Sequence, residues 1–256
     1  MDANSLQSYR TLSPVPRKQL FHPPATVRAV VTRTASGINS SGSKITTSSN
    51  SKNVYRDNWF DRLAINHLSH CLRAVTGLGS GKNGYDGLVE TTTAVYRNID
   101  SAQQQKIVLQ ALEKSIPKPI LLLMRTVLPQ TTFIRECCAA FTTIFLTWLV
   151  GPCEVREGDF MERKEKNTVH VVKCRFLEET NCVGMCTNLC KIPTQTFIKK
   201  SMGMHVNMVP NFDDMSCEMI FGQVPPSSSE DPALNQPCYK LCNLKRKHHQ
   251  NYCSNE

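Results

Sequence analysis

The stretch Phe-Leu-Glu-Glu-Thr-Asn-Cys-Val-Gly-Met-Cys-Thr-Asn-Leu-Cys-Lys-Ile-Pro-Thr-Gln-Thr-Phe, residues 176–197, carries three cysteines at intervals of four residues. On an α-helix this spacing places side chains on one face, one turn above another. The sequence therefore predicts a short helix from Glu178 to Lys191 that turns all three thiols toward one side.

Cysteines are concentrated around this stretch, because eight of the twelve in the chain lie between residues 174 and 253. Thiolates ligate thiophilic metals, although this spacing matches neither the standard zinc nor the standard ferredoxin patterns. A structural zinc site, or buried thiols that pack as small hydrophobic side chains, are the alternatives. The candidate metal ligands are Cys174, Cys182, Cys186, Cys190, Cys217, Cys238 and Cys242.

The N-terminal region has a different composition from the rest of the chain. Its first 56 residues hold eight Lys or Arg, a single acid and sixteen Ser or Thr, which is typical of an organelle transit peptide. We assign residues 1–52 to a disordered transit peptide of a plastid or a mitochondrion, with an ordinary solvated leader as the alternative. In a reducing organelle, the cysteines are not expected to serve mainly as structural disulfides. The remaining 200 residues carry 22 bases and 20 acids, which argues against a nucleic-acid partner.

Helical periodicity dominates the first half of the remaining chain. It predicts helices over residues 57–76, 85–98 and 101–116, and a short apolar helix that Pro119 opens. A further helix over residues 133–150 is apolar on nearly every face. Its uncharged run is fourteen residues long, too short to span a bilayer. This segment is either a fully buried core helix or a helix that contacts lipid or a long apolar ligand.

The second half alternates between charged and strand-like segments. Residues 152–167 are charged and predict a solvated loop or an edge strand, whereas residues 170–176 alternate and predict a strand. We expect Pro193 to stop the cysteine-bearing helix, and residues 206–209 and 217–221 to form a hairpin. The predicted fold class is α+β, with an all-helical domain over residues 53–153 and a cysteine-rich metal-binding α+β domain with a flexible tail over residues 154–256.

The cysteine-bearing stretch quoted above resembles the C-terminal signature of the plant carotenoid isomerases called Dwarf twenty-seven. Other segments resemble the same family. They are Val-Pro-Asn-Phe-Asp-Asp-Met-Ser-Cys over residues 209–217, Pro237-Cys238 and Cys242 near the C-terminus, Gly-Tyr-Asp-Gly-Leu over residues 84–88, and Trp-Leu-Val-Gly-Pro-Cys over residues 148–153. The resemblance covers most of residues 57–244. Residues 57–62, the Phe-Asp-Asp form of the 209–217 loop and the Gln-rich third helix resemble a paralogous branch of that family.

This resemblance implies a plastid enzyme that interconverts all-trans- and 9-cis-β-carotene, at the entry to carlactone and strigolactone hormones. It also implies iron. We hypothesise that Cys182, Cys186 and Cys190 bind this iron as an iron–sulfur cluster. The ligand set would be completed by Cys174, Cys217, Cys238 or Cys242. A conjugated double bond rotates once its bond order is lowered, by transfer of one electron, by protonation or by a Lewis acid. Iron on thiolates can supply and recover one electron without a nicotinamide cofactor. The rival hypothesis is a non-catalytic, metal-stabilised plastid scaffold that binds carotenoid or a protein.

A substrate of about forty carbon atoms requires long apolar walls and a route from the lipid that dissolves it. We expect the helical domain to supply those walls, and the protein to make peripheral contact with plastid membranes. The sequence indicates no particular catalytic side chain. The candidate substrate-binding residues are Leu122, Phe141, Phe145 and Trp148.

Overall fold

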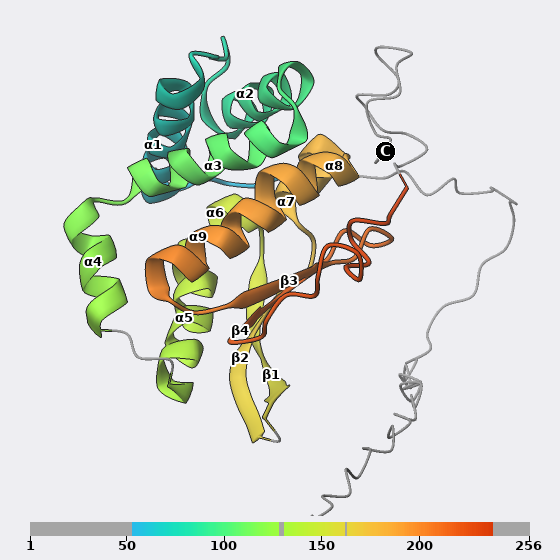
Figure 1. Cartoon of the computed structure of the whole chain (residues 1–256). Coiled ribbons are helices and arrows are strands. Elements are labelled where there is room, and N and C mark those ends of the chain that lie inside the picture. The colour runs from blue at the N-terminus through green and yellow to red at the C-terminus, as the bar shows by residue number, and fades with distance from the viewer. Residues whose placement is uncertain (1–52, 128–130, 162, 238–256) are drawn as a thin grey trace, which may run out of the picture. The chain divides into compact units, whose positions relative to one another are not determined.

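The computed structural model describes residues 53–127, 131–161 and 163–237 (Figure 1). The predicted transit peptide, the predicted tail, Cys238 and Cys242 lie outside these described residues. The elements are α1 (Trp59–Thr76), α2 (Gly84–Asn98), α3 (Ser101–Ser115), α4 (Lys118–Val127), α5 (Thr132–Phe145), α6 (Thr147–Val150), β1 (Cys153–Phe160), β2 (Arg163–Val171), α7 (Arg175–Thr180), α8 (Val183–Met185), the π-helix η1 (Cys186–Lys191), α9 (Ile192–Met202), β3 (Val206–Pro210) and β4 (Cys217–Phe221).

Local capping interactions set the limits of the first helices. Asn58 accepts hydrogen bonds from the backbone of the first turn of α1, and the Asp61 carboxylate accepts the Asn58 N–H in return at 2.9 Å, which completes a capping box. Gly77 ends α1 in the left-handed conformation at φ 68°. Asp100 caps α3 by accepting the Gln103 N–H at 3.0 Å. The structure therefore confirms the three helices that periodicity predicts here.

The strands form one antiparallel sheet in the order β1-β2-β4-β3. Alternate residues of β4 are buried, beginning with Cys217, so one face of this strand lies in the core. Cys217 is in register with Val171 of β2 on one side and with Pro210 of β3 on the other. The predicted hairpin over residues 206–221 is confirmed, and its register places a thiol at the end of an interior strand.

The charged segment after α6 forms the edge strand β1, and β2 begins earlier than predicted, at Arg163. β2 already ends at Val171, so the predicted strand over residues 170–176 is wrong in its bounds. The physical reason for the earlier start of β2 is an ion pair between this strand and helix α5. The Arg135 guanidinium of α5 donates two hydrogen bonds of 2.7 Å to the Glu165 carboxylate, so a charged residue of β2 becomes buried.

The single helix predicted from Glu178 to Lys191 is also wrong. Asn181 adopts a left-handed conformation with φ 46° and ends α7, after which the chain forms the short α8 and then η1. Pro193 does not stop a helix. It lies in the first turn of α9, where a missing backbone N–H is tolerated. Cys182 consequently precedes α8 as its N-cap, whereas Cys186 and Cys190 both lie in η1.

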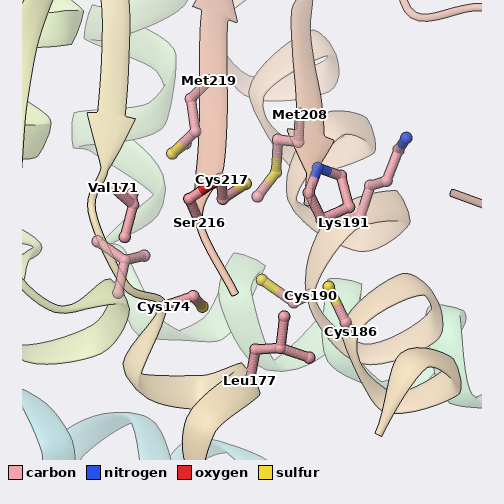
Figure 2. Close-up of a pocket in the computed structure, with 12 residues that line it drawn as sticks. Val171, Cys174, Leu177, Cys186, Cys190, Lys191, Met208, Ser216, Cys217 and Met219 are labelled. Carbon is pink, nitrogen blue, oxygen red and sulfur yellow. The ribbon is translucent and has the colours of Figure 1, made fainter. Parts of the chain in front are cut away.

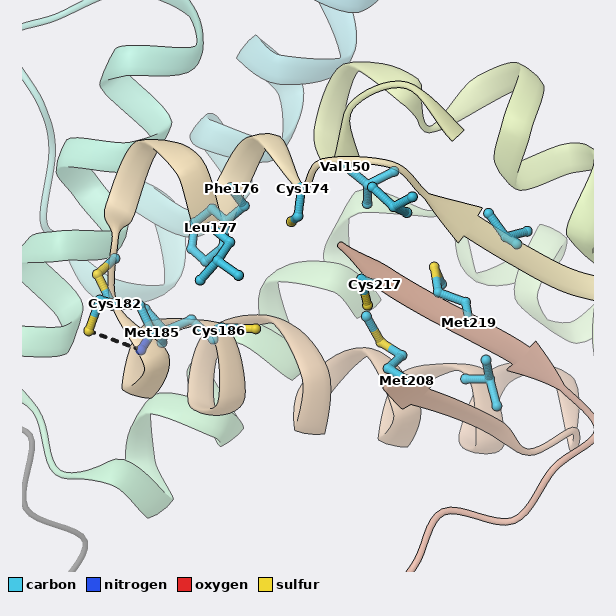
Figure 3. Packing of buried hydrophobic residues seen from close by; sticks show 14 of the residues in the cluster. Val150, Cys174, Phe176, Leu177, Cys182, Met185, Cys186, Met208, Cys217 and Met219 are labelled. Atoms are coloured by element: carbon cyan, nitrogen blue, oxygen red, sulfur yellow. Dashed lines mark hydrogen bonds between the residues drawn. The ribbon is translucent and has the colours of Figure 1, made fainter. Parts of the chain in front are cut away.

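The helices and the sheet share a hydrophobic core, part of which is shown in Figure 3. Val95 and Tyr96 of α2 belong to the same buried cluster as Val169, Met219 and other strand residues. The described residues form one compact unit, and the predicted division at residues 153 and 154 falls inside it, between α6 and β1. The α+β fold class is confirmed.

The apolar segment over residues 133–150 is not the fully buried core helix that its composition allowed. It divides into α5 and α6 at Leu146, and α5 lies against β2. The buried positions of α5 are Arg135, Ala139 and Thr142, whereas large apolar side chains occupy its exposed face. Among the described residues, none of the helices combines the length and apolar character needed to cross a membrane.

Candidate active site

Four of the candidate thiols come from three different segments of the chain. Cys174 follows β2 immediately before α7, and its N–H donates to the Met215 carbonyl at 2.7 Å. This bond joins the Cys174 segment to the turn that precedes β4, where Cys217 begins the strand. Cys186 and Cys190 are supplied by η1.

The π-helix η1 is the local feature that presents two of these thiols. Short π segments are rare and are frequent at functional sites. Here the segment spans Cys186 to Lys191, so both thiols lie within one wide turn. The i→i+5 bonding makes this turn wider than the α-helical turn on which the four-residue spacing argument was based.

The four thiols line a cavity of about 20 Å³, as Figure 2 shows. Val150, Leu177, Met208 and Met219 complete much of its apolar wall. Lys191 contributes to the lining, but its ammonium points away from the sulfur atoms (Figure 2). A space of this size accommodates about one water molecule. The thiols therefore face a small, almost water-free space. The four cysteines that line this thiol cavity are Cys174, Cys186, Cys190 and Cys217.

Gly151 allows the chain to pass close to this cavity. It has φ +93°, and a Cβ atom here would lie 2.8 Å from the Lys173 carbonyl oxygen. Only glycine tolerates both constraints. The close approach brings Val150 beside the Cys174 segment, and both residues line the cavity. The sequence signal for this feature is the Gly151-Pro152 pair.

Burial raises the pKa values of all four thiols, and neighbouring thiols add to the effect at Cys186, Cys190 and Cys217. Burial raises the pKa of Cys190 to about 12, and the Cys174 thiol adds to this effect. The pKa values of Cys186 and Cys217 are raised well above the ordinary value, first by burial and then by neighbouring thiols, although Lys191 lowers both. The pKa of Cys174 is raised mainly by burial. Without a cation in the cavity, these groups are neutral thiols at physiological pH.

This electrostatic arrangement predicts alkaline sensitivity of the metal-free protein. A thiol whose pKa is raised by folding contributes stability that is complete below its unfolded value, 9.0, and that is lost as the pH rises toward its folded value. We expect the free energy of unfolding to fall above pH 9, by up to about 1.4 kcal/mol per pH unit for each such thiol. Urea unfolding between pH 7 and 10.5 measures this slope.

Cys190→Ala should flatten the alkaline slope, because it removes one of the thiols whose pKa is raised in the folded protein. Cys137→Ala is the matched control, since that thiol is exposed and should leave the slope unchanged. A slope that is identical in the wild type and in Cys190→Ala would show that the cavity thiols do not carry the alkaline effect.

The donor set of the cavity suits a soft metal, because thiolates are the ligands of iron–sulfur centres and of structural zinc. In the part of the chain that the structure describes, no group of three His, Cys, Asp or Glu side chains is arranged closely enough to hold a metal ion as it stands. The chemistry of the four sulfur atoms therefore fits a thiophilic metal, but their positions do not form a closed ligand set.

Cys182 lies apart from the other candidate ligands. It caps α8, where its Sγ accepts the Met185 N–H at 3.5 Å, the contact drawn as a dashed line in Figure 3. It is fully buried but does not line the thiol cavity. The predicted triplet on one helix face is therefore wrong, because the chain turns at Asn181 and places Cys182 before a new helix. Cys238 and Cys242 lie outside the described residues.

A second, apolar cavity of about 70 Å³ adjoins the thiol cavity. The two cavities share Val150, Cys174 and Cys190 in their walls. On its other sides the apolar cavity is lined by residues of α1, α2 and α3, among them Leu72, Leu88 and Ala111. The helical layer thus meets the thiols across an apolar space, a feature that hydrophobic periodicity alone does not reveal.

The predicted substrate-binding residues occupy two different environments. Phe141 and Phe145 of α5 lie side by side on the surface, with ring centroids 4.7 Å apart. Leu122 of α4 is exposed as well. Trp148 of α6 is instead buried in a second core cluster with residues of α1, α2 and α3. The structure therefore places the two phenylalanines together but does not bring all four residues into one groove.

A buried ion pair beside the cavity was not predicted from the sequence. The Lys191 Nζ lies 2.5 Å from a carboxylate oxygen of Asp231, and both side chains are buried. Asp231 also accepts the Ala233 N–H at 3.0 Å. The pair fastens the segment after β4 onto the end of η1. Forty residues separate the partners in sequence, so no local pattern indicates the contact.

The fold and the site define an α+β protein whose buried thiols adjoin an apolar cavity. The family model "Beta-carotene isomerase D27-like, C-terminal" matches residues 148–230, which include all four cavity thiols. The chain is 62% identical over 196 residues to "Beta-carotene isomerase D27, chloroplastic" of Medicago truncatula, covering 77% of this chain and 78% of the relative.

Identity to the protein of the same description from Arabidopsis thaliana is 47% over 203 residues, covering 78% of this chain and 77% of the relative. No solved structure matches the chain significantly. The chain belongs to the β-carotene isomerase D27 family. Its predicted placement in a paralogous branch stays a prediction.

Proposed function

We propose that this chain is a plastid β-carotene isomerase that interconverts the all-trans and 9-cis isomers, using iron held by the cavity thiols. The family supports the reaction and the plastid location, since both relatives are described as chloroplastic β-carotene isomerases. The observation that carries the site is the pair of adjoining cavities, one lined by thiols and the other apolar, with Cys174 and Cys190 in both walls. A product that enters strigolactone synthesis is part of the same proposal.

The residues that would hold iron are Cys174, Cys186, Cys190 and Cys217. Their raised pKa values mean that iron binding must displace protons, which makes the affinity for iron increase with pH. Iron held there would supply reversible one-electron chemistry, which is one way to lower the bond order of the polyene without net redox change. The donors must close in on the ion, since they are not a ligand set as they stand.

The remaining residues of the site bind and shield the polyene. The apolar walls supplied by Leu72, Leu88 and Leu149 exclude water from the face of the thiols that meets the second cavity. Exclusion of water protects a polyene with lowered bond order from side reactions. The cavity of about 70 Å³ is much smaller than a ligand site of about 300 Å³ or more, so it holds only part of the substrate and must widen toward the helical layer.

The test uses the full chain, purified without oxygen and incubated with all-trans-β-carotene in detergent micelles. We expect 9-cis-β-carotene to form without added nicotinamide, together with iron and acid-labile sulfide in the protein. Zinc in place of iron, with no exchange of isomers, would instead support a metal-stabilised scaffold.

Filling the apolar cavity tests whether the substrate reaches the thiols through it. Ala111→Val adds two carbon atoms at a fully buried residue of the cavity wall. We expect this variant to keep its iron and its thermal stability but to isomerise carotene about tenfold more slowly, because the polyene loses room beside Cys190. Activity equal to the wild type, in a variant with full iron content, would place the substrate elsewhere.

A further inference from the structure

Helix α5 is amphipathic in the opposite sense to an ordinary surface helix. Its buried positions include a charged arginine and a threonine, Arg135 and Thr142. Its exposed positions after the first residue are Phe133, Cys137, Ala140, Phe141, Ile144 and Phe145, all of them apolar. Surface helices normally present polar side chains to water. Continuous apolar exposure along a helix marks a surface that binds something.

The apolar face continues from the end of α5 onto the first turns of α1. The Phe60 and Phe145 ring centroids lie 6.1 Å apart, and Trp59 packs edge-on against Phe60 at the same distance. Trp59, Leu63 and Ile144 are each more than half exposed, at 78%, 60% and 66%. The aromatic surface comprises Trp59, Phe60, Leu63, Phe141, Ile144 and Phe145.

We propose that the aromatic surface is the site at which this protein docks onto a lipid bilayer, with the side chains of α5 and of the start of α1 inserted among the acyl chains. This inference rests on the proposed function, because a hydrocarbon substrate of about forty carbons dissolves in lipid and not in water. Helices that lie at a membrane–water interface typically carry tryptophan and phenylalanine on one face, with arginines beside that face.

The charges at the edge of the aromatic surface suit lipid headgroups. Arg56 and Arg62 flank Trp59 in sequence and are exposed. The two nearby carboxylates are engaged elsewhere, since Asp57 binds the Arg175 guanidinium at 2.6 and 2.9 Å and Asp61 caps α1. The edge therefore carries positive charge, which anionic lipid attracts.

The composition of the surface favours lipid over a protein partner. Protein interfaces contain about one hydrogen bond per 100–200 Å² of buried area, for which both sides need polar groups. The six residues of the aromatic surface offer no polar side-chain group except the indole N–H of Trp59. Indole N–H groups are well accommodated at the headgroup level of a membrane.

The surface also adjoins the route to the thiols. Phe145 ends α5, and α6 follows within two residues. Leu149 and Val150 of α6 then line the apolar cavity, which reaches Cys174 and Cys190. The aromatic surface and the cavity wall thus belong to one short segment of the chain, so docking would bring the membrane close to the residues that line the cavity.

Trp59 provides a built-in probe, because the only other tryptophan, Trp148, is buried. We expect vesicles of mixed phosphatidylcholine and phosphatidylglycerol to shift the emission of the full chain to the blue, and brominated acyl chains to quench it. Trp59→Phe should abolish both signals. Unchanged emission with vesicles would overturn the proposal, as would emission already blue in buffer, which would mean that the chain itself or a second copy covers the surface.

Variants separate docking from chemistry. The triple variant Trp59→Ser, Leu63→Ser and Ile144→Ser should bind vesicles at least about tenfold more weakly and isomerise vesicle-borne carotene correspondingly more slowly. In detergent micelles its activity and iron content should match the wild type. Val172→Ser with Val224→Ser is the matched control, since both residues are more than half exposed outside this surface.

Vesicle binding can be measured even if the protein has no isomerase activity. Failure of the proposed function and failure of docking are therefore distinguishable. Equal vesicle binding by the triple variant and the wild type would overturn the docking proposal. Loss of activity in micelles as well would show that these residues support the fold or the chemistry and not the membrane contact.

Discussion

Cys186→Ser is expected to lose iron and to isomerise β-carotene more than about 100-fold more slowly than the wild type. Changes in residues that only support metal ligands cost about 10–100-fold, and a ligand itself should cost more. Serine is a poor ligand for iron in a site built for thiolates, and the Cys186 position is buried, so water has little access to replace the lost donor. Iron content and the rate of isomer exchange, measured on the same anaerobic sample, check this prediction.

Two other buried cysteines supply the controls for this experiment. Cys71→Ser changes a buried thiol of the separate core cluster and should keep iron and activity. Cys182→Ser distinguishes the structure from the sequence pattern, because a serine hydroxyl can still accept the Met185 N–H that caps α8. If Cys182→Ser loses iron as completely as Cys186→Ser, the iron is bound by the three cysteines at four-residue spacing and not by the four cysteines that line the cavity.

Lys191→Met is expected to lower the free energy of unfolding by about 3–5 kcal/mol. Removing one partner of a buried ion pair leaves the other charge unpaired in an apolar environment. Asp231 would then be a buried carboxylate without its cation, although the Ala233 N–H would still donate to it. Because the pair holds the end of η1, we also expect iron affinity to fall. Urea unfolding of the metal-free protein measures the first effect.

A double-mutant cycle isolates the ion pair from other contributions. Lys191→Met with Asp231→Leu should destabilise much less than the sum of the two single changes, because no unpaired charge remains. The exposed pair of Lys164 and Asp159 is the reference, and Lys164→Met should change stability far less than Lys191→Met, because solvent screens an exposed pair. Additive single effects at Lys191 and Asp231 would contradict the coupling that the structure indicates.

The features predicted correctly from the sequence are those that neighbouring residues determine. The capping carboxylate of Asp100, the stop at Gly77 and the hairpin over residues 206–221 follow from local patterns, and each places its element within a few residues of the observed bounds. The concentration of cysteines also indicated a thiol site, and four of the predicted ligands line one cavity.

The features that were missed depend on tertiary contacts. Glu165 is buried in a strand because Arg135 reaches it from α5, which reverses the expectation from a charged run. The left-handed Asn181 and the π-helix that follows replace a regular helix, so the four-residue spacing does not put Cys182 with Cys186. The apolar composition of α5 could not show which of its faces meets the sheet, and the larger side chains face outward.

The most direct test of an iron-dependent isomerase is a titration of iron into the metal-free protein, with the rate of conversion of all-trans- to 9-cis-β-carotene followed at each step. We expect this rate to rise in proportion to the iron bound by the cavity thiols and to be absent in Cys186→Ser at every iron concentration. Full activity in the metal-free protein would contradict this expectation.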